Sequence, residues 1–200
     1  MRNPALILAS SSPYRRALLQ RLRLDFSCHA PEVDEARRED EDPEALATRL
    51  ARAKAQAVAR QEPGALVIGS DQVASLDGQP FGKPGSADTA RRQLERSSGR
   101  CVRFDTAVAL ARDDTLLACR SVPFEVQFRS LSASQIARYV ELEKPLDCAG
   151  SFRWEGLGIS LFRSLRGDDP TALEGLPLIA LVDMLAAQGV NPLAPRQPAP

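Results

Sequence analysis

The stretch LILASSSPYRRALL, residues 6–19, sets the fold from the start of the chain. Its first four residues are apolar and predict a short buried strand. Ser12 is a favoured helix N-cap and Pro13 a favoured first helical residue, so we expect a helix over residues 14–24. A buried strand, a serine-rich turn and a helix in direct succession are typical of the opening of an α/β protein.

The alternation of strand and helix continues before it gives way to paired strands. Asp42 and Pro43 repeat the helix start signal, and an apolar strand over residues 65–69 is expected to end at Ser70 and Asp71. The pattern further predicts a hairpin turn at Asp77-Gly78, a helix from Ser86 to about Gly99, strands over 102–108 and 122–128, a helix from Ser132 to about Leu142, a strand over 157–162 and a helix over 177–188. We therefore expect a mixed sheet with helices on its faces.

The chain has the length of a single domain. Its 200 residues, 44% of them apolar, can bury a normal core, and no internal repeat or linker interrupts them. We expect one domain over residues 1–193. The Pro-rich tail over residues 194–200 is expected to fray.

The balance of charge excludes some classes of partner. Basic and acidic residues number 26 each, so no global field attracts nucleic acid or an anionic membrane. The sequence has no uncharged apolar run of about 18 residues. Its four cysteines lie far apart without a CxxC pair, which suits reduced thiols. We expect a cytoplasmic protein that binds neither nucleic acid nor membrane.

The serine-rich turn is the first candidate for chemistry. Ser10 begins a run of three hydroxyl residues, and Arg15 and Arg16 follow in the first turn of the helix. Backbone N–H groups at a helix start can form a polyanion pocket together with such side chains. The alternative is an ordinary N-cap followed by a solvated basic turn.

Two acidic motifs are candidates for metal binding or acid–base chemistry. Glu32, Asp34 and Glu35 stand within four residues and can hold a hard cation, although such a run is often only an exposed acidic loop. Asp71 follows the apolar strand, where a carboxylate can bind metal or activate water. A plain strand-ending turn is the alternative there.

Other polar residues say less when they are read alone. Lys54 and Lys83 are typical of solvated lysines, and His29, the only histidine, has no motif around it. No P-loop or dinucleotide fingerprint is present. Any anion site must therefore be local and built from a few placed residues.

Taken in order, six segments resemble the Maf family of nucleotide pyrophosphatases. They are LILASSSPYRRALL at 6–19, APEVDE at 30–35, the helix with Lys54, IGSDQV at 68–73, GKP at 82–84 and CAGSFRWEGLG at 148–158. The resemblance runs from residue 6 to about 193, and the joint match is far more specific than any single motif. It implies an elongated mixed sheet with two lobes and a central cleft, similar to inosine-triphosphate pyrophosphatases, and a homodimer in many members.

The resemblance also implies a reaction and roles for particular residues. Family members hydrolyse a nucleoside triphosphate to the monophosphate and pyrophosphate with a divalent cation, Mg²⁺ or Mn²⁺. Carried onto this chain, Asp71 would be the general base and would share metal binding with Glu32. Phosphate contacts and catalytic positive charge would come from Ser10, Arg15, Lys54 and Lys83. These roles agree with what phosphoryl chemistry requires.

Departures from the common family pattern resemble the subgroup that hydrolyses 7-methyl-GTP. Tyr14 and Gln72 stand where many members have Arg and Thr, and Trp154-Glu155 differs from the pyrimidine-specific pattern. A 7-methylguanine base is cationic, so Tyr14 or Trp154 could stack on it, and Glu155 could accept from the donor edge of guanine. Both aromatic residues could instead be ordinary packed side chains.

The sequence leaves two other functions open. One is a pyrimidine pyrophosphatase that acts on dTTP or UTP, and Gln72 and Glu155 are the discriminating positions. The other is a non-enzymatic nucleotide-binding regulator of septum formation. Retention of Asp71, Lys54 and Lys83 argues against a pure sensor. The expected function is therefore hydrolysis of 7-methyl-GTP, a house-cleaning role against modified nucleotides.

Overall fold

A computed structural model describes residues 4–194, so most of the expected frayed tail lies outside the described residues. With η marking a 3-10 helix, the elements in chain order are β1 (Leu6–Ala9), α1 (Pro13–Gln20), β2 (Ser27–His29), α2 (Pro43–Ala59), β3 (Leu66–Leu76), β4 (Gln79–Phe81), α3 (Ala87–Ser97), β5 (Cys101–Arg112), β6 (Thr115–Phe128), α4 (Ala133–Glu143), η1 (Ala149–Ser151), η2 (Leu157–Leu161), β7 (Phe162–Arg166), η3 (Pro170–Glu174) and α5 (Leu178–Ala186). None of these helices is long and apolar enough to cross a membrane.

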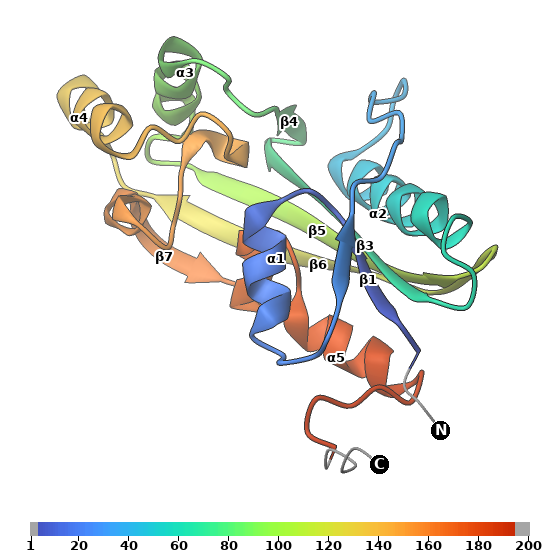
Figure 1. The fold of residues 1–200 in the computed structure, drawn as a ribbon. Coiled ribbons are helices and arrows are strands. Elements are labelled where there is room, and N and C mark those ends of the chain that lie inside the picture. The colour runs from blue at the N-terminus through green and yellow to red at the C-terminus, as the bar shows by residue number, and fades with distance from the viewer. Residues whose placement is uncertain (1–3, 195–200) are drawn as a thin grey trace.

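The strands of the described chain form one mixed sheet. Six of them follow the order β2-β1-β3-β5-β6-β7, and β4 pairs with β3. β1 is parallel to β2 and β3, whereas β3, β5, β6 and β7 pair in antiparallel fashion. The expected mixed α/β sheet, elongated along β5 and β6, is confirmed (Figure 1).

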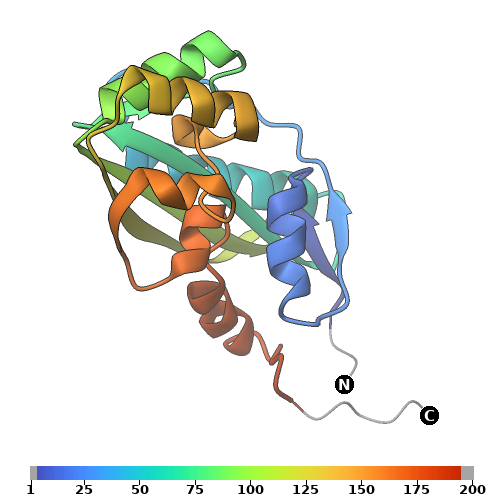
Figure 2. The same ribbon diagram turned by 90° about the vertical axis from the view of Figure 1, so that its left-hand side faces the viewer.

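Buried side chains form three clusters around this sheet. Successive residues of a strand point to opposite faces, so Leu6 and Leu8 pack with α1 and α5, whereas Ile7 and Ala9 pack against α2. A third cluster lies at the far end of the sheet, where α3 and α4 run side by side (Figure 2). It contains edge-to-face aromatic contacts among Phe104, Phe128, Phe152 and Phe162.

The helix starts agree with the sequence, and one helix end does not. Side-chain N-caps are made as predicted by Ser12, Asp42, Ser86 and Ser132. The capping box at Ser132 and Gln135 is also present. α1 ends at Gln20 rather than at residue 24, because Arg23 adopts a left-handed φ of 54° that a helix cannot accommodate.

The strand expected over residues 65–69 does not end at Ser70 and Asp71. β3 runs on to Leu76 because its antiparallel ladder with β5 is continuous from Val67 to Ser75. Its parallel partner β1 stops at Ala9, opposite Gly69. β4 joins the same edge of β3 only from Ala74. The stretch of β3 that carries Asp71 is therefore open on one edge, within an unbroken strand.

The strand expected over residues 157–162 is also wrong. Residues Leu157–Leu161 form the 3-10 helix η2, and β7 begins only at Phe162. The chain folds back here because the N–H of Gly158 bonds the carbonyl of Arg153 at 3.0 Å. β2, a short strand beside β1, was not anticipated from the sequence.

Gly69 allows α2 to lie directly on β3. A Cβ at this position would lie 2.3 Å from the carbonyl oxygen of Ala51 and 2.5 Å from the nitrogen of Ala55, both in α2. Such distances are far below van der Waals contact, so only glycine fits without displacement of the helix. This close approach brings Lys54 of α2 next to Asp71 of β3.

Gly69→Ala should destabilise the protein and weaken the Lys54–Asp71 contact. Overpacking of this kind typically costs about 1–3 kcal/mol, and urea unfolding would measure it. Gly82→Ala is the matched control, since a Cβ at that position meets no atom within 4 Å. Equal stabilities for the two variants would contradict the role given to Gly69.

Candidate active site

A cavity of about 640 Å³ opens where β1 ends beside β3. Its walls come from the serine-rich turn, α1, α2, β3 and the segment after α4. Among its lining residues are all the site residues expected from the sequence except one: Ser10, Tyr14, Arg15, Lys54, Asp71, Gln72, Lys83, Trp154 and Glu155. Glu32 is exposed and is not part of the lining, whereas Glu35 from the same acidic run is.

Lys54 stands at the centre of the charged groups in this cavity. Its Nζ lies 2.6 Å from Oδ1 of Asp71 and 2.7 Å from Oε1 of Glu35. Lys54 and Asp71 are both buried, so their charge-assisted contact is shielded from water, whereas Glu35 is exposed. The hydrogen bond from Lys54, together with the nearby positive charges, lowers the pKa of Glu35. The solvated lysine that the sequence suggested is thus a buried bridge between two carboxylates.

Arg15 adds a second fixed positive charge. Its Nε donates to the carbonyl of Gly175 at 2.8 Å, which anchors α1 to the loop after η3. Burial lowers the pKa of Arg15, while the charges of Asp71 and Glu35 act in the opposite direction. The Arg15 guanidinium is therefore held near Lys54, Asp71 and Glu35, and Arg15 lines the cavity.

The serine-rich turn is ordered by its own hydrogen bonds. Oγ of the buried Ser10 accepts from the N–H of Ser12 at 3.1 Å. Oγ of Ser12 in turn accepts from the N–H of Arg15 and caps α1. The turn is therefore the N-cap that the sequence predicted, and it also faces a charged cavity.

Gln72 holds the loop at η3 in place. Its Nε2 donates to the carbonyl of Ala172 at 2.7 Å and lies 3.0 Å from Oγ1 of Thr106. Ser70, two residues earlier on β3, donates to the carbonyl of Gly175 at 2.9 Å. The donors of Gln72 are thus occupied by protein groups, although its side chain still lines the cavity.

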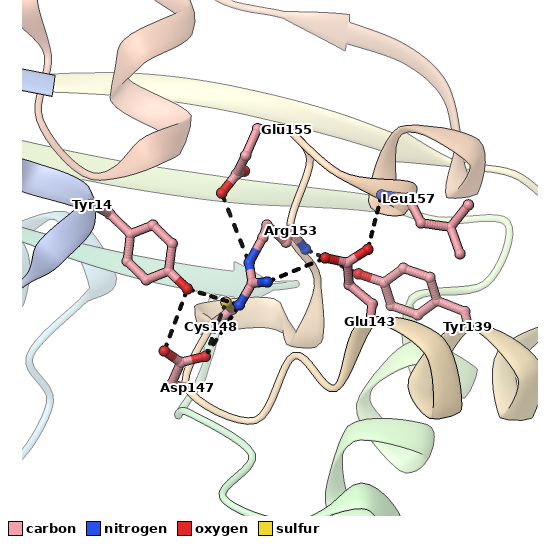
Figure 3. A network of polar contacts seen from close by, with 8 residues as sticks. All are labelled: Tyr14, Tyr139, Glu143, Asp147, Cys148, Arg153, Glu155 and Leu157. Carbon is pink, nitrogen blue, oxygen red and sulfur yellow. Dashed lines mark hydrogen bonds and ion pairs between the residues drawn. The ribbon is translucent and has the colours of Figure 1, made fainter. Parts of the chain in front are cut away.

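A network of charged residues and tyrosines, centred on Arg153, lines another part of the cavity (Figure 3). Nη2 of Arg153 donates to the Tyr14 hydroxyl at 2.8 Å, and Nη1 lies 3.2 Å from Oε1 of Glu143. Asp147 and Glu155 flank the same guanidinium at 3.7 and 3.9 Å. Burial, followed by neighbouring negative charge, raises the pKa of Tyr14, so its hydroxyl stays protonated at neutral pH.

Trp154 combines packing with an unused hydrogen-bond donor. Its side chain is half-buried against the aromatic cluster and also lines the cavity. Its Nε1 is buried, and no described residue accepts from it. A buried indole N–H usually has a partner, so this unpaired donor departs from the common pattern.

The donor set fits a hard divalent cation that is completed by other ligands. Asp71 and Glu35 supply two carboxylates that converge on one ammonium group. In the described residues no cluster of three or more His, Cys, Asp or Glu side chains could enclose a metal alone. Mg²⁺ commonly uses one or two carboxylates and takes its other ligands from phosphates and water. Asp71 and Glu35 would therefore hold such an ion beside Lys54.

Sequence reasoning missed three contributions to this site. Glu35 was read only as part of an acidic run, and Arg153 lay unremarked inside the motif CAGSFRWEGLG. Glu174 reaches the cavity from η3, a 3-10 helix that sequence periodicity does not reveal. Burial, with the negative charges of Glu155 and Asp169 also contributing, raises the pKa of Glu174.

Lys54→Met should raise the pKa of Glu35 toward that of an ordinary glutamate. The hydrogen bond from Lys54 is the largest cause of the lowered pKa, and the substitution removes both that bond and a charge. A carboxyl-detected NMR titration would follow the change. Lys83→Met, which removes only a more distant charge, should raise the pKa less. An unchanged Glu35 pKa in Lys54→Met would disprove the contact.

Comparison with known proteins places the chain in a family. Residues 5–188 match the family model described as Maf, Maf-like protein. The chain is 56% identical to the 7-methyl-GTP pyrophosphatase of Alcanivorax borkumensis over 94% of this chain and 96% of the relative. It is 56% identical to that of Pseudomonas aeruginosa (94% and 98%) and 57% identical to that of Xanthomonas axonopodis (93% and 97%).

Among solved structures, a HAM1 protein from Coxiella burnetii matches with a TM-score of 0.46 at 19% identity, covering 63% of this chain and 73% of that one. That likeness is too slight to carry an argument about function. The family match spans nearly the whole described chain. The chain therefore belongs to the Maf family.

Proposed function

We propose that this protein hydrolyses 7-methyl-GTP to 7-methyl-GMP and pyrophosphate with a divalent cation, Mg²⁺ or Mn²⁺. The observation that carries the proposal is the charge polarity of the cavity. Where β1 meets β3, the cations Arg15, Lys54 and Lys83 outnumber the carboxylates Asp71 and Glu35. Around Arg153, the carboxylates of Asp147, Glu155 and Glu174 outnumber the single cation. This arrangement is complementary to a nucleotide with an anionic triphosphate and a cationic base. The names of relatives that are 56–57% identical support the same reaction.

We call the part of the cavity around Lys54 the phosphate end and the part around Arg153 the base end. At the phosphate end the protein supplies both binding groups and positive charge. Arg15, Lys54 and Lys83 all line this part of the cavity, and Ser10 adds a hydroxyl beside the start of α1. Fixed cations stabilise the charge that develops on the phosphate oxygens and on the departing pyrophosphate. A bound divalent cation would neutralise further phosphate charge there, held by Asp71 and Glu35 together with the exposed Glu32 that the family resemblance implies.

Asp71 is placed to activate the attacking water. Its Oδ1 is held by Lys54 at 2.6 Å, and no described group donates to its Oδ2. The oriented carboxylate can therefore accept a proton from water through its second oxygen while Lys54 fixes its position. With the α-phosphate bound beside Asp71, the activated water would attack the α-phosphorus and pyrophosphate would leave.

At the base end the lining favours a positively charged purine. Asp147, Glu155 and Glu174 contribute three carboxylates, and Arg153 is the one basic side chain among the described lining residues there. Tyr14 and Trp154 supply aromatic faces from either side of the network. A cationic base gains from both the aromatic faces and the excess of carboxylates.

Two alternatives receive less support from the same residues. A neutral pyrimidine of dTTP or UTP would leave the carboxylates at the base end uncompensated. A non-enzymatic regulator has no need of the buried Lys54–Asp71 pair, which costs desolvation free energy. We further propose that the protein acts as a cytoplasmic homodimer without nucleic-acid or membrane partners. The free, dispersed cysteines suit that compartment, and the dimer rests on the family resemblance.

Asp71→Asn should abolish most turnover and leave nucleotide binding largely intact. A positioned general base contributes about 10²-fold or more, so kcat should fall by at least that factor. The assay follows pyrophosphate release from 7-methyl-GTP with Mg²⁺ or Mn²⁺. Wild-type activity that yields orthophosphate, or that persists in chelator, would contradict the proposed reaction.

Glu155→Gln should reduce kcat/KM for 7-methyl-GTP by about tenfold, or about 1.4 kcal/mol, because it removes a charge near the cationic base. The kcat/KM for GTP and for dTTP should change much less. Glu141→Gln is the matched control, since Glu141 lies on α4 in an exposed pair with Arg138. A uniform loss for all three nucleotides, or a wild-type preference for dTTP or UTP, would exclude the assigned base pocket.

A further inference from the structure

Arg153 connects the two sides of the cavity through its side chain, and we propose that it is the positioning residue for base specificity. In this role it fixes the Tyr14 ring and the Glu155 carboxylate relative to each other, so that both can engage one base. The inference rests on the proposed function and adds a residue that sets which base is accepted.

The first side of this connection is α1. Nη2 of Arg153 donates to the Tyr14 hydroxyl at 2.8 Å, and the guanidinium carbon lies 5.6 Å from the centre of the Tyr14 ring. Oδ2 of Asp147 accepts from the same hydroxyl at a longer 3.4 Å. Tyr14 is therefore held at its hydroxyl, and one face of its ring is approached by Arg153. The ring cannot swing freely in the cavity (Figure 3).

The second side is α4 and the turn that follows it. Nη1 of Arg153 lies 3.2 Å from Oε1 of Glu143, whose Oε2 accepts from the N–H of Leu157 at 2.9 Å. The backbone N–H of Arg153 also donates to the Tyr139 hydroxyl at 3.0 Å. Arg153 and Glu143 together bind both ends of the turn that carries Trp154 and Glu155.

Two glycines make this turn tight. A Cβ at Gly158 would lie 2.2 Å from the carbonyl oxygen of Arg153. A Cβ at Gly156 would lie 2.8 Å from Oε1 of Glu143. The backbone on either side of Glu155 is therefore packed directly against the Arg153–Glu143 pair. Movement of that pair would displace Glu155 as well.

Arg153 does not contact the groups assigned to the chemistry. Its side chain contacts Tyr14, Glu143, Asp147 and Glu155, and its backbone bonds Tyr139, Gly156 and Gly158. None of these residues belongs to the phosphate end. Lys54 and Asp71 are held by separate contacts across α2 and β3. Loss of Arg153 should therefore change selection of the base more than kcat, the rate at which bound substrate is hydrolysed.

Charge alone predicts the opposite result, which makes the inference testable. Removal of Arg153 leaves the carboxylates of Glu143, Asp147 and Glu155 without their shared cation. If net charge governed selection, the more negative base end would bind a cationic base more tightly. If the positions of Tyr14 and Glu155 govern selection, the preference for 7-methyl-GTP falls although the site becomes more negative.

The experiment compares kcat and KM for 7-methyl-GTP and GTP in wild type, Arg153→Met and Arg153→Lys. We expect Arg153→Met to reduce the ratio of kcat/KM for 7-methyl-GTP to kcat/KM for GTP by about tenfold. Most of this change should come from a higher KM for 7-methyl-GTP. The kcat for GTP should stay within about twofold of the wild-type value. Arg153→Lys should restore part of the ratio, since an ammonium can reach one partner but cannot replace the two-sided guanidinium contact.

Arg138→Met is the matched control, because it breaks an exposed ion pair on α4 away from the cavity. Thermal melting of each variant separates misfolding from altered selection. In Tyr14→Phe, which keeps the ring and removes the hydroxyl, a further Arg153→Met change should reduce the ratio by less than it does in wild type.

An unchanged or increased ratio in a folded Arg153→Met variant overturns the inference. An equal fall in kcat for both nucleotides overturns it too, since that result marks a general structural role. Failure of the proposed function is visible separately, in wild type alone, as an absence of preference for 7-methyl-GTP. The effect of Arg153 on selection is then measured on whichever base the wild type prefers.

Discussion

The close packing of α2 on β3 at Gly69 is the constraint on which the site depends. Without a side chain at that position, the helix backbone approaches the strand closely enough for Lys54 to reach Asp71 at 2.6 Å. The same ammonium holds Glu35. The pair sits where β1 has ended and β4 has not yet begun, so the open edge of β3 becomes the floor of a cavity. Packing of the core thereby determines the electrostatics of the site.

The cavity joins two regions of different construction. Its phosphate end is built on regular elements, where α1, α2 and β3 fix cations against carboxylates. Its base end is built on a tight turn after α4 and is held by one guanidinium. We propose that phosphate chemistry uses the charges placed by the regular elements, and that base selection uses the turn that Arg153 holds.

Most of the fold could be predicted from the sequence, because caps and strand periodicity are local signals. The misplaced end of β3 shows the limit: Ser70 and Asp71 carry a turn signal, but a ladder with a distant strand overrides it. The burial of Lys54 was equally invisible, since it depends on Gly69 in another element. Arg153 was missed because its importance lies in partners from α1 and α4, which only the tertiary structure brings together.

The orientation of the nucleotide is the central claim, and a crystal structure of the Asp71→Asn variant with 7-methyl-GTP tests it most directly. The account predicts the triphosphate against Arg15, Lys54 and Lys83, with the base beside Tyr14 and Glu155. The N7-methylated ring should face the carboxylates, and the α-phosphorus should lie nearest residue 71. A nucleotide bound with its base at the Lys54 end, or bound outside the cavity, would contradict the account.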